Sequence, residues 1–238
     1  MLFRSLQREL IANISHDLRT PLTMIQGYAE TMRDIPHEMT PENMQIIIDE
    51  TERLASLVNE IMDFSRLQAG SMQMEISVFD LTETVRSICA RVSAMTEQDG
   101  YRIACLAEGV CPVKGDSARI SQVVYNLLGN ALTYTGNDKQ VILKQDDRGS
   151  TVRISISDSG KGIDPAELPF IWDRYYRTKE SHKRAVIGSG LGLNICRGIL
   201  ESHKVPYGVD SVPGVGTTFW FEMEKARETQ SEYFGTDV

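Results

Sequence analysis

Hydrophobic positions in residues 1–70 follow the period of an α-helix. Apolar residues recur at steps of three or four, and glycine is rare in this part of the chain. Such a stripe covers one face of a helix. The first stripe contains Ile11, Ile14, Leu18, Leu22, Ile25, Ala29 and Met32, and the second contains Met44, Ile47, Thr51, Leu54, Val58 and Ile61, extended by Phe64 and Leu67. The pattern predicts two long amphipathic helices between about residues 6 and 67.

The stretch "DIPHEMTPEN" separates these two helices. Thr40 is a typical N-cap residue, and Pro41 suits the first position of the helix that follows. A single helical hairpin cannot cover its own apolar stripe, so two hairpins that pair into a four-helix bundle are the simplest solution. We therefore predict a homodimer formed through residues 1–70.

From about residue 74 onward the pattern becomes mixed. Val152, Ile154 and Ile156 alternate with polar residues, as in a half-buried strand. "QVILKQDDRGS" supplies a partner strand and a turn, and "TTFWFEME" alternates again. Helical patterns cover Leu81–Thr96, Ala118–Leu132 and Gly192–Ser202. These elements predict an α+β sandwich over residues 74–226, with an antiparallel-rich sheet, helices on one face, and a polar tail at 227–238.

Composition and charge exclude several classes of protein. The chain of 238 residues has 25 basic and 33 acidic residues, a formal net charge of −8, which argues against direct nucleic-acid binding. The four cysteines have no metal-ligand spacing. No apolar run approaches the ~20 residues needed to cross a bilayer. We therefore expect a soluble chain located in the cytoplasm.

Three glycine clusters point to an anionic ligand. "DSGKGIDP" follows the strand that ends at Asp158, "GSGLGL" opens a helix, and "PGVGTTF" leads into the last strand. Glycine lets the backbone turn sharply and approach a ligand closely, and the N–H groups at a helix N-terminus bind phosphates well. One such cluster is more often a plain turn, but three in this order, with "NLLGNALTYT" upstream, are hard to reach by chance and favour a ligand with phosphates.

A pair of asparagines adds a candidate magnesium site. Asn126 and Asn130 lie four residues apart in "NLLGNALTYT", hence on one helix face. Two amide oxygens can orient Mg²⁺ and its waters beside a triphosphate, since this ion prefers oxygen ligands. Each asparagine alone would fit a solvated helix position.

Five ordered motifs carry a family resemblance. "SHDLRTPL", "NLLGNALTYT", "DSGKGI", "FIWDRYYR" and "GSGLGL" have the order and rough spacing of the H, N, G1, F and G2 boxes of bacterial sensor histidine kinases. The chain resembles this family over about residues 8 to 225. The resemblance implies a dimerisation and phosphoacceptor hairpin followed by a Bergerat-type ATP-binding domain, the fold shared with Hsp90, DNA gyrase and MutL.

The resemblance also implies roles for individual residues. It makes His16 the phosphoacceptor, Asp158 the carboxylate that reads the adenine amino group, and Asn126 and Asn130 the magnesium and phosphate ligands. The other implied nucleotide contacts are Tyr134, Gly160, Gly162, Arg174, Arg177, Gly188, Gly190, Leu191, Gly192 and Thr217, with Lys183 or Arg184 as further cations. Thr133 stands where the family often has a lysine, and Ser159 where it often has asparagine.

The residues beside His16 suit phosphoryl transfer. Taken alone, His16 fits an ordinary polar residue on a helix, and its heptad phase predicts an exposed position. Asp17 can accept a proton from one ring nitrogen while the other attacks. Thr20 lies one turn on, and Pro21 allows the helix to bend there. The family implies transfer to a response-regulator receiver domain, with Asp17 and Thr20 also serving the reverse phosphatase reaction.

Two other functions stay open on the residues alone. An ATPase or chaperone of the same nucleotide-binding fold would lack the "SHDLRTPL" hairpin. A non-catalytic scaffold that binds a regulator is favoured only by Thr133. The family further implies that a membrane-spanning sensor part, absent from this chain, holds the full-length protein at the inner face of a bacterial membrane.

Overall fold

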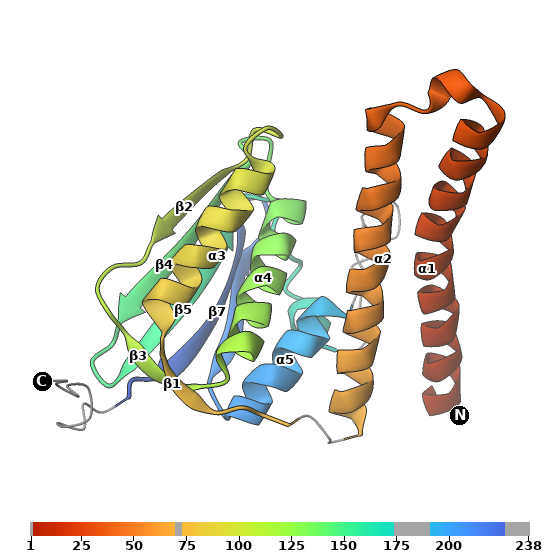
Figure 1. Cartoon of the computed structure of the whole chain (residues 1–238). Coiled ribbons are helices and arrows are strands. Elements are labelled where there is room, and N and C mark those ends of the chain that lie inside the picture. The colour runs from red at the N-terminus through yellow and green to blue at the C-terminus, as the bar shows by residue number, and fades with distance from the viewer. Residues whose placement is uncertain (1, 70–72, 174–190, 227–238) are drawn as a thin grey trace, which may run out of the picture. The chain divides into compact units, whose positions relative to one another are not determined.

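The computed structural model describes residues 2–69, 73–173 and 191–226 (Figure 1). The chain divides into two compact units, one containing a helical hairpin and the other containing a whole mixed sheet with most of its helical cover. Each unit is described by itself. No helix in the described ranges combines the length and the apolar character that a membrane span requires.

The first unit is built on two long helices. Helix α1 spans Leu2–Asp34 with Pro21 inside it, a short 3₁₀ turn covers Pro36–Glu38, and α2 spans Pro41–Gln68. The Thr40 hydroxyl accepts the backbone N–H of Asn43 at 3.2 Å, which satisfies one of the free donors at the start of α2. The predicted hairpin and its N-cap are confirmed.

Helix α2 carries more apolar surface than its contact with α1 covers. Ile47, Leu54 and Ile61 are half-buried. A parallel row stays exposed in the single chain: Met44 (42% exposed), Ile48 (49%), Val58 (46%) and Met62 (51%). An unpaired hairpin thus leaves one apolar seam uncovered.

The second unit is organised by a five-stranded sheet with the order β2-β4-β5-β7-β6. Strand β2 pairs with β4 in parallel, and the other neighbours are antiparallel. The strands are β2 (Arg102–Leu106), β4 (Gln140–Asp147), β5 (Thr151–Asp158), β6 (Tyr207–Val212) and β7 (Gly216–Glu224), and a separate pair joins β1 (Ser77–Asp80) to β3 (Pro112–Gly115).

Helices cover one face of this sheet (Figure 1). They are α3 (Leu81–Thr96), α4 (Ser117–Tyr134) and α5 (Gly192–His203). Val152, Ile154 and Ile156 of β5 are at most 1% exposed, because alternate strand residues point into the layer between sheet and helices. The predicted α+β sandwich is confirmed, and Leu81–Thr96 is the range that the hydrophobic pattern predicts for α3.

Sequence reasoning did not identify β1, β2, β3 or β6. These strands have 4, 5, 4 and 6 residues, too few for alternation to stand out from a loop. Strand β2 also pairs in parallel with β4, and paired residues such as Leu106 and Lys144 lie 38 positions apart in the chain. No local turn signal therefore announces β2.

Candidate active site

The carboxylate of Asp158 lies at the end of β5, as the glycine cluster after this strand predicts. Its Oδ1 accepts the backbone N–H of Gly160 at 2.8 Å. Burial raises the pKa of this carboxyl group, and backbone hydrogen bonds from Gly160 and Thr217 lower it only in part. The site therefore holds one half-buried carboxylate with a fixed orientation.

The glycines after Asp158 permit a close approach of two loops. A Cβ on Gly160 would collide with the carbonyl oxygen of Tyr134, the last residue of α4. Gly162 has φ of +71°, a conformation that L side chains rarely adopt. The strand end is therefore held directly against the end of α4.

Helix α4 also carries the two asparagines. Asn126 and Asn130 are half-buried, whereas Val124, Leu127 and Leu128 of the same helix are at most 1% exposed. Tyr134 is 43% exposed. The apolar face fixes the helix to the sheet, and the asparagines occupy the border of that face.

Thr217 and Thr133 differ in what they offer a ligand. Thr217 pairs with Asp158 across β7 and β5, is 6% exposed, and lies 2.9 Å from Ser211 through their hydroxyl oxygens. Thr133 is exposed, and its hydroxyl donates to the Gly129 carbonyl at 2.7 Å within α4. No cation stands at position 133.

The residue types suit magnesium held together with phosphates. Within residues 2–69, 73–173 and 191–226, no group of three or more His, Cys, Asp or Glu side chains could hold a metal by itself. The amide oxygens of Asn126 and Asn130 are hard donors on one helix face. Mg²⁺ keeps several waters and binds through one or two protein oxygens plus substrate phosphates, which this pair fits.

Several expected contacts lie outside the described residues. These are Arg174, Arg177, Lys183, Arg184, Gly188 and Gly190. Of the same glycine cluster, Leu191 is 1% exposed and Gly192 begins α5. The helix start that the "GSGLGL" pattern predicts is therefore confirmed.

The candidate phosphoacceptor belongs to the helical hairpin. The backbone of His16 is part of α1, and its side chain falls outside the described residues. Asp17 is half-buried, Thr20 is exposed and Pro21 is buried. One helical turn therefore carries all of the residues expected to serve the reacting histidine.

A polar cluster between the two loops was not foreseen. The Ser159 hydroxyl donates to the Asp138 carboxylate. Thr135 lies 3.1 Å from Ser159 through their hydroxyl oxygens. Nothing in the local sequence announces this contact, because it joins residues 21 positions apart, at the two ends of the β4–β5 hairpin.

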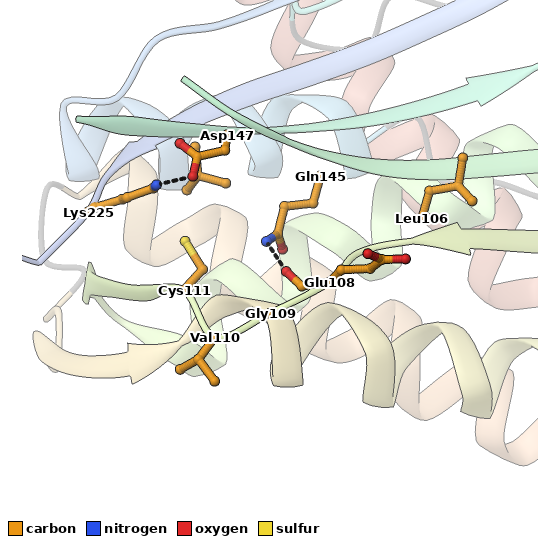
Figure 2. Close-up of a pocket in the computed structure, with 9 residues that line it drawn as sticks. Leu106, Glu108, Gly109, Val110, Cys111, Gln145, Asp147 and Lys225 are labelled. Atoms are coloured by element: carbon orange, nitrogen blue, oxygen red, sulfur yellow. Dashed lines mark hydrogen bonds and ion pairs between the residues drawn. The ribbon is translucent and has the colours of Figure 1, made fainter. Parts of the chain in front are cut away.

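A cavity of about 330 Å³ lies at the opposite end of β4 and β5 (Figure 2). Lys225 pairs with Asp147 there at 2.6 Å, and Gln145 donates to the Glu108 carbonyl at 3.4 Å. Asp147 pairs with Val152, whereas Asp158 pairs with Val141 at the other end of the same ladder. This cavity contains none of the expected site residues.

Two family models match two separate parts of the chain. Residues 6–70 match the His Kinase A (phospho-acceptor) domain. Residues 115–227 match the histidine kinase-, DNA gyrase B- and HSP90-like ATPase family. The first range contains His16, and the second contains Asn126, Asn130, Asp158 and Thr217.

Individual proteins agree with these matches. The phosphate regulon sensor protein PhoR of Pseudomonas aeruginosa is 30% identical over 95% of this chain, which spans 52% of PhoR. Full-length ShkA in complex with AMPPNP has a TM-score of 0.66 and 28% identity, covering 92% of this chain and 46% of ShkA. Histidine kinase ThkA in complex with response regulator protein TrrA has a TM-score of 0.65 and 26% identity, covering 95% and 64%.

Proposed function

The chain belongs to the two-component sensor histidine kinases, and on this premise we propose that it uses ATP to phosphorylate its own His16 and then passes the phosphoryl group to a response-regulator aspartate. The observation that carries the proposal is the half-buried, fixed carboxylate of Asp158 beside α4, which bears both asparagines. AMPPNP, an ATP analogue, is bound to the similar ShkA.

Residues 74–226 bind the nucleotide. Asp158 accepts a hydrogen bond from the adenine amino group, and Tyr134 packs against the base. Asn126 and Asn130 would hold magnesium through their amide oxygens, and a bound ion would supply neutralisation of the charge on the phosphates. Thr217, Gly160, Gly162, Leu191 and Gly192 shape the rest of the pocket, together with Arg174, Arg177, Gly188 and Gly190.

His16 is the nucleophile. A neutral imidazole is available near pH 7, because its ordinary pKa is about 6.5. One ring nitrogen attacks the γ-phosphorus, the bond from this phosphorus to the bridging oxygen breaks, and ADP leaves. Asp17 accepts the proton of the other ring nitrogen and so orients the ring.

The proposed partners follow from the same premise. The complex of the similar ThkA with TrrA supports a receiver domain as acceptor of the phosphoryl group. Asp17 and Thr20 position water when the enzyme dephosphorylates its regulator. Residues 1–70 form a homodimer, residues 74–226 are the catalytic domain, and a sensor part outside this chain holds the protein at the inner face of the membrane.

Labelling with [γ-³²P]ATP and magnesium tests this function directly. The wild-type chain is expected to acquire an acid-labile, base-stable phosphoryl group, as phosphohistidine requires. His16→Gln should abolish the label, while His37→Gln, a matched change in the turn between α1 and α2, should keep it. Adding a receiver domain should then remove label from the wild-type protein.

The alternatives give different results. Label that survives in His16→Gln would exclude His16 as the acceptor. A wild-type chain that binds ATP without becoming labelled would contradict the kinase assignment and favour the scaffold.

A further inference from the structure

The loop after α4 and the loop after β5 are joined by side chains. Ser159 donates its hydroxyl proton to the Asp138 carboxylate, and its oxygen accepts the Gly136 N–H at 3.4 Å. The Thr135 hydroxyl donates to the Gln140 carbonyl at 2.7 Å and so fixes the same loop to the start of β4. Each hydroxyl proton thus has one acceptor.

This junction of residues 134–138 with residues 159 and 160 lies directly beside Asp158. Ser159 follows Asp158 directly, and Gly160 donates its N–H to Asp158 Oδ1 at 2.8 Å. The Tyr134 carbonyl lies so close to Gly160 that no Cβ fits between them. A Cβ on Gly136 would likewise lie only 2.8 Å from the Ser159 carbonyl oxygen. The loop of residues 134–138 therefore packs tightly against residues 159 and 160.

We propose that Ser159 and Asp138 are positioning residues that hold the carboxylate of Asp158 for adenine and thereby set the preference for adenine over guanine. The proposal rests on the proposed function of Asp158. Adenine presents an amino donor at C6, whereas guanine presents a carbonyl acceptor there. A carboxylate fixed in one orientation accepts from the first and repels the second.

The contacts of residues 136 and 138 with Ser159 fix the orientation of the Asp158 carboxylate. Binding groups need to be held within about 0.5 Å and 10–20° of the productive geometry by their supporting residues. Without the Ser159 hydroxyl, the segment from Asp158 to Gly160 loses its side-chain tie to residues 136 and 138. The Asp158 side chain then samples more orientations, and the energy difference between the two bases shrinks.

A double-mutant cycle in the full chain tests the pair. We expect Ser159→Ala and Asp138→Ala each to weaken ADP binding about fivefold in calorimetry, the scale of the typical net contribution of one hydrogen bond. The double variant should be no weaker than either single variant, because the two residues act as one unit. The ratio of ADP to GDP affinity should fall by a similar factor in all three.

The control removes a comparable hydroxyl pair. Ser157 lies 2.8 Å from Thr218 of β7 through their hydroxyl oxygens, so Ser157→Ala should leave both nucleotide affinities unchanged. A merely structural loss would lower the thermal midpoint without changing the ratio of ADP to GDP affinity.

Three results would overturn the proposal: unchanged ADP binding in both single variants, effects that multiply in the double variant, or an unchanged preference between ADP and GDP. A wild-type chain that binds no ADP would instead contradict the proposed function.

Discussion

Ionisation of Asp158 has opposite effects on the stability of the folded chain and on the proposed binding of adenine. Burial raises its pKa in the folded chain, so ionisation at neutral pH costs the folded state free energy. The sign follows from linkage: this cost is absent when both folded and unfolded carboxyls are protonated, and it is complete above the folded pKa. The proposed binding of adenine, in contrast, needs the ionised acceptor.

Asp158→Asn should therefore raise stability at neutral pH and weaken nucleotide binding. At pH 7 the variant is expected to unfold at higher urea concentration than wild type, an advantage that disappears below the ordinary carboxyl pKa of about 3.9. ADP affinity should fall about tenfold or more, because an amide nitrogen can replace the oxygen that faces the base. Calorimetry and urea titrations at both pH values measure this.

Asp164→Asn is the matched control, since Asp164 is an exposed loop carboxylate that accepts the Ala166 N–H at 2.8 Å. This variant should change neither the urea concentration of unfolding nor the ADP affinity. Lower stability of Asp158→Asn at pH 7 would contradict the argument from burial.

Some residues of the candidate site could be predicted from the sequence, and others could not. Asp158 and the two asparagines could be named from motifs, because each lies next to a local pattern such as a strand end or a helix face. The contact of Ser159 with Asp138 could not, because it depends on how two loops meet after folding. In the sequence, Ser159 stands out only because the family often has asparagine at this position.

At the scale of elements, local signals decided which parts of the fold could be predicted. Long periodic segments, such as Leu81–Thr96, and the tight hairpin between β4 and β5 carry their own start and stop signals. The short strands β1, β2 and β3 owe their structure to partners distant in sequence. Tertiary pairing, more than local propensity, forms such strands.

Helix α4 depends on its N-cap more than sequence suggests. Asp116 is 5% exposed, and its carboxylate accepts both the Arg119 N–H and the Glu75 N–H at 3.0 Å. Its own backbone N–H donates to His203 Nε2 at 3.0 Å. One residue thus joins the start of α4 to the segment before β1 and to the end of α5.

Asp116→Ala is expected to lower the free energy of unfolding of the sheet unit by about 2 kcal/mol, since it removes a helix cap and leaves a second N–H unsatisfied. Tryptophan fluorescence during urea titration measures this, because both tryptophans of the chain, Trp172 and Trp220, belong to the sheet unit. Asp164→Ala should stay within about 0.5 kcal/mol of wild type. An equally small effect of Asp116→Ala would show that the cap is dispensable.

The whole molecule combines the sheet unit, which buries its own hydrophobic core, with the helical hairpin, which leaves part of its apolar surface exposed. Phe221, Leu143 and Ile154 of the sheet unit are fully buried. In the hairpin, Met44, Thr51 and Val58 follow one another at seven-residue spacing, as do Ile48, Ala55 and Met62, and all six are exposed. A heptad row of this kind is a coiled-coil seam, and two copies of the hairpin can cover it for each other.

Val58→Glu should therefore convert a dimer into a monomer. The substitution places a carboxylate in the middle of the seam, and each dimer would bury two of them, so the dissociation constant should rise at least about a hundredfold. Sedimentation equilibrium measures the change. Ser56→Glu adds the same charge at an exposed position away from the seam, and this control should stay dimeric. Both variants should bind ADP like wild type, because every described residue proposed to contact nucleotide lies outside the hairpin. A Val58→Glu chain that stays dimeric would place the interface elsewhere than on this face of α2.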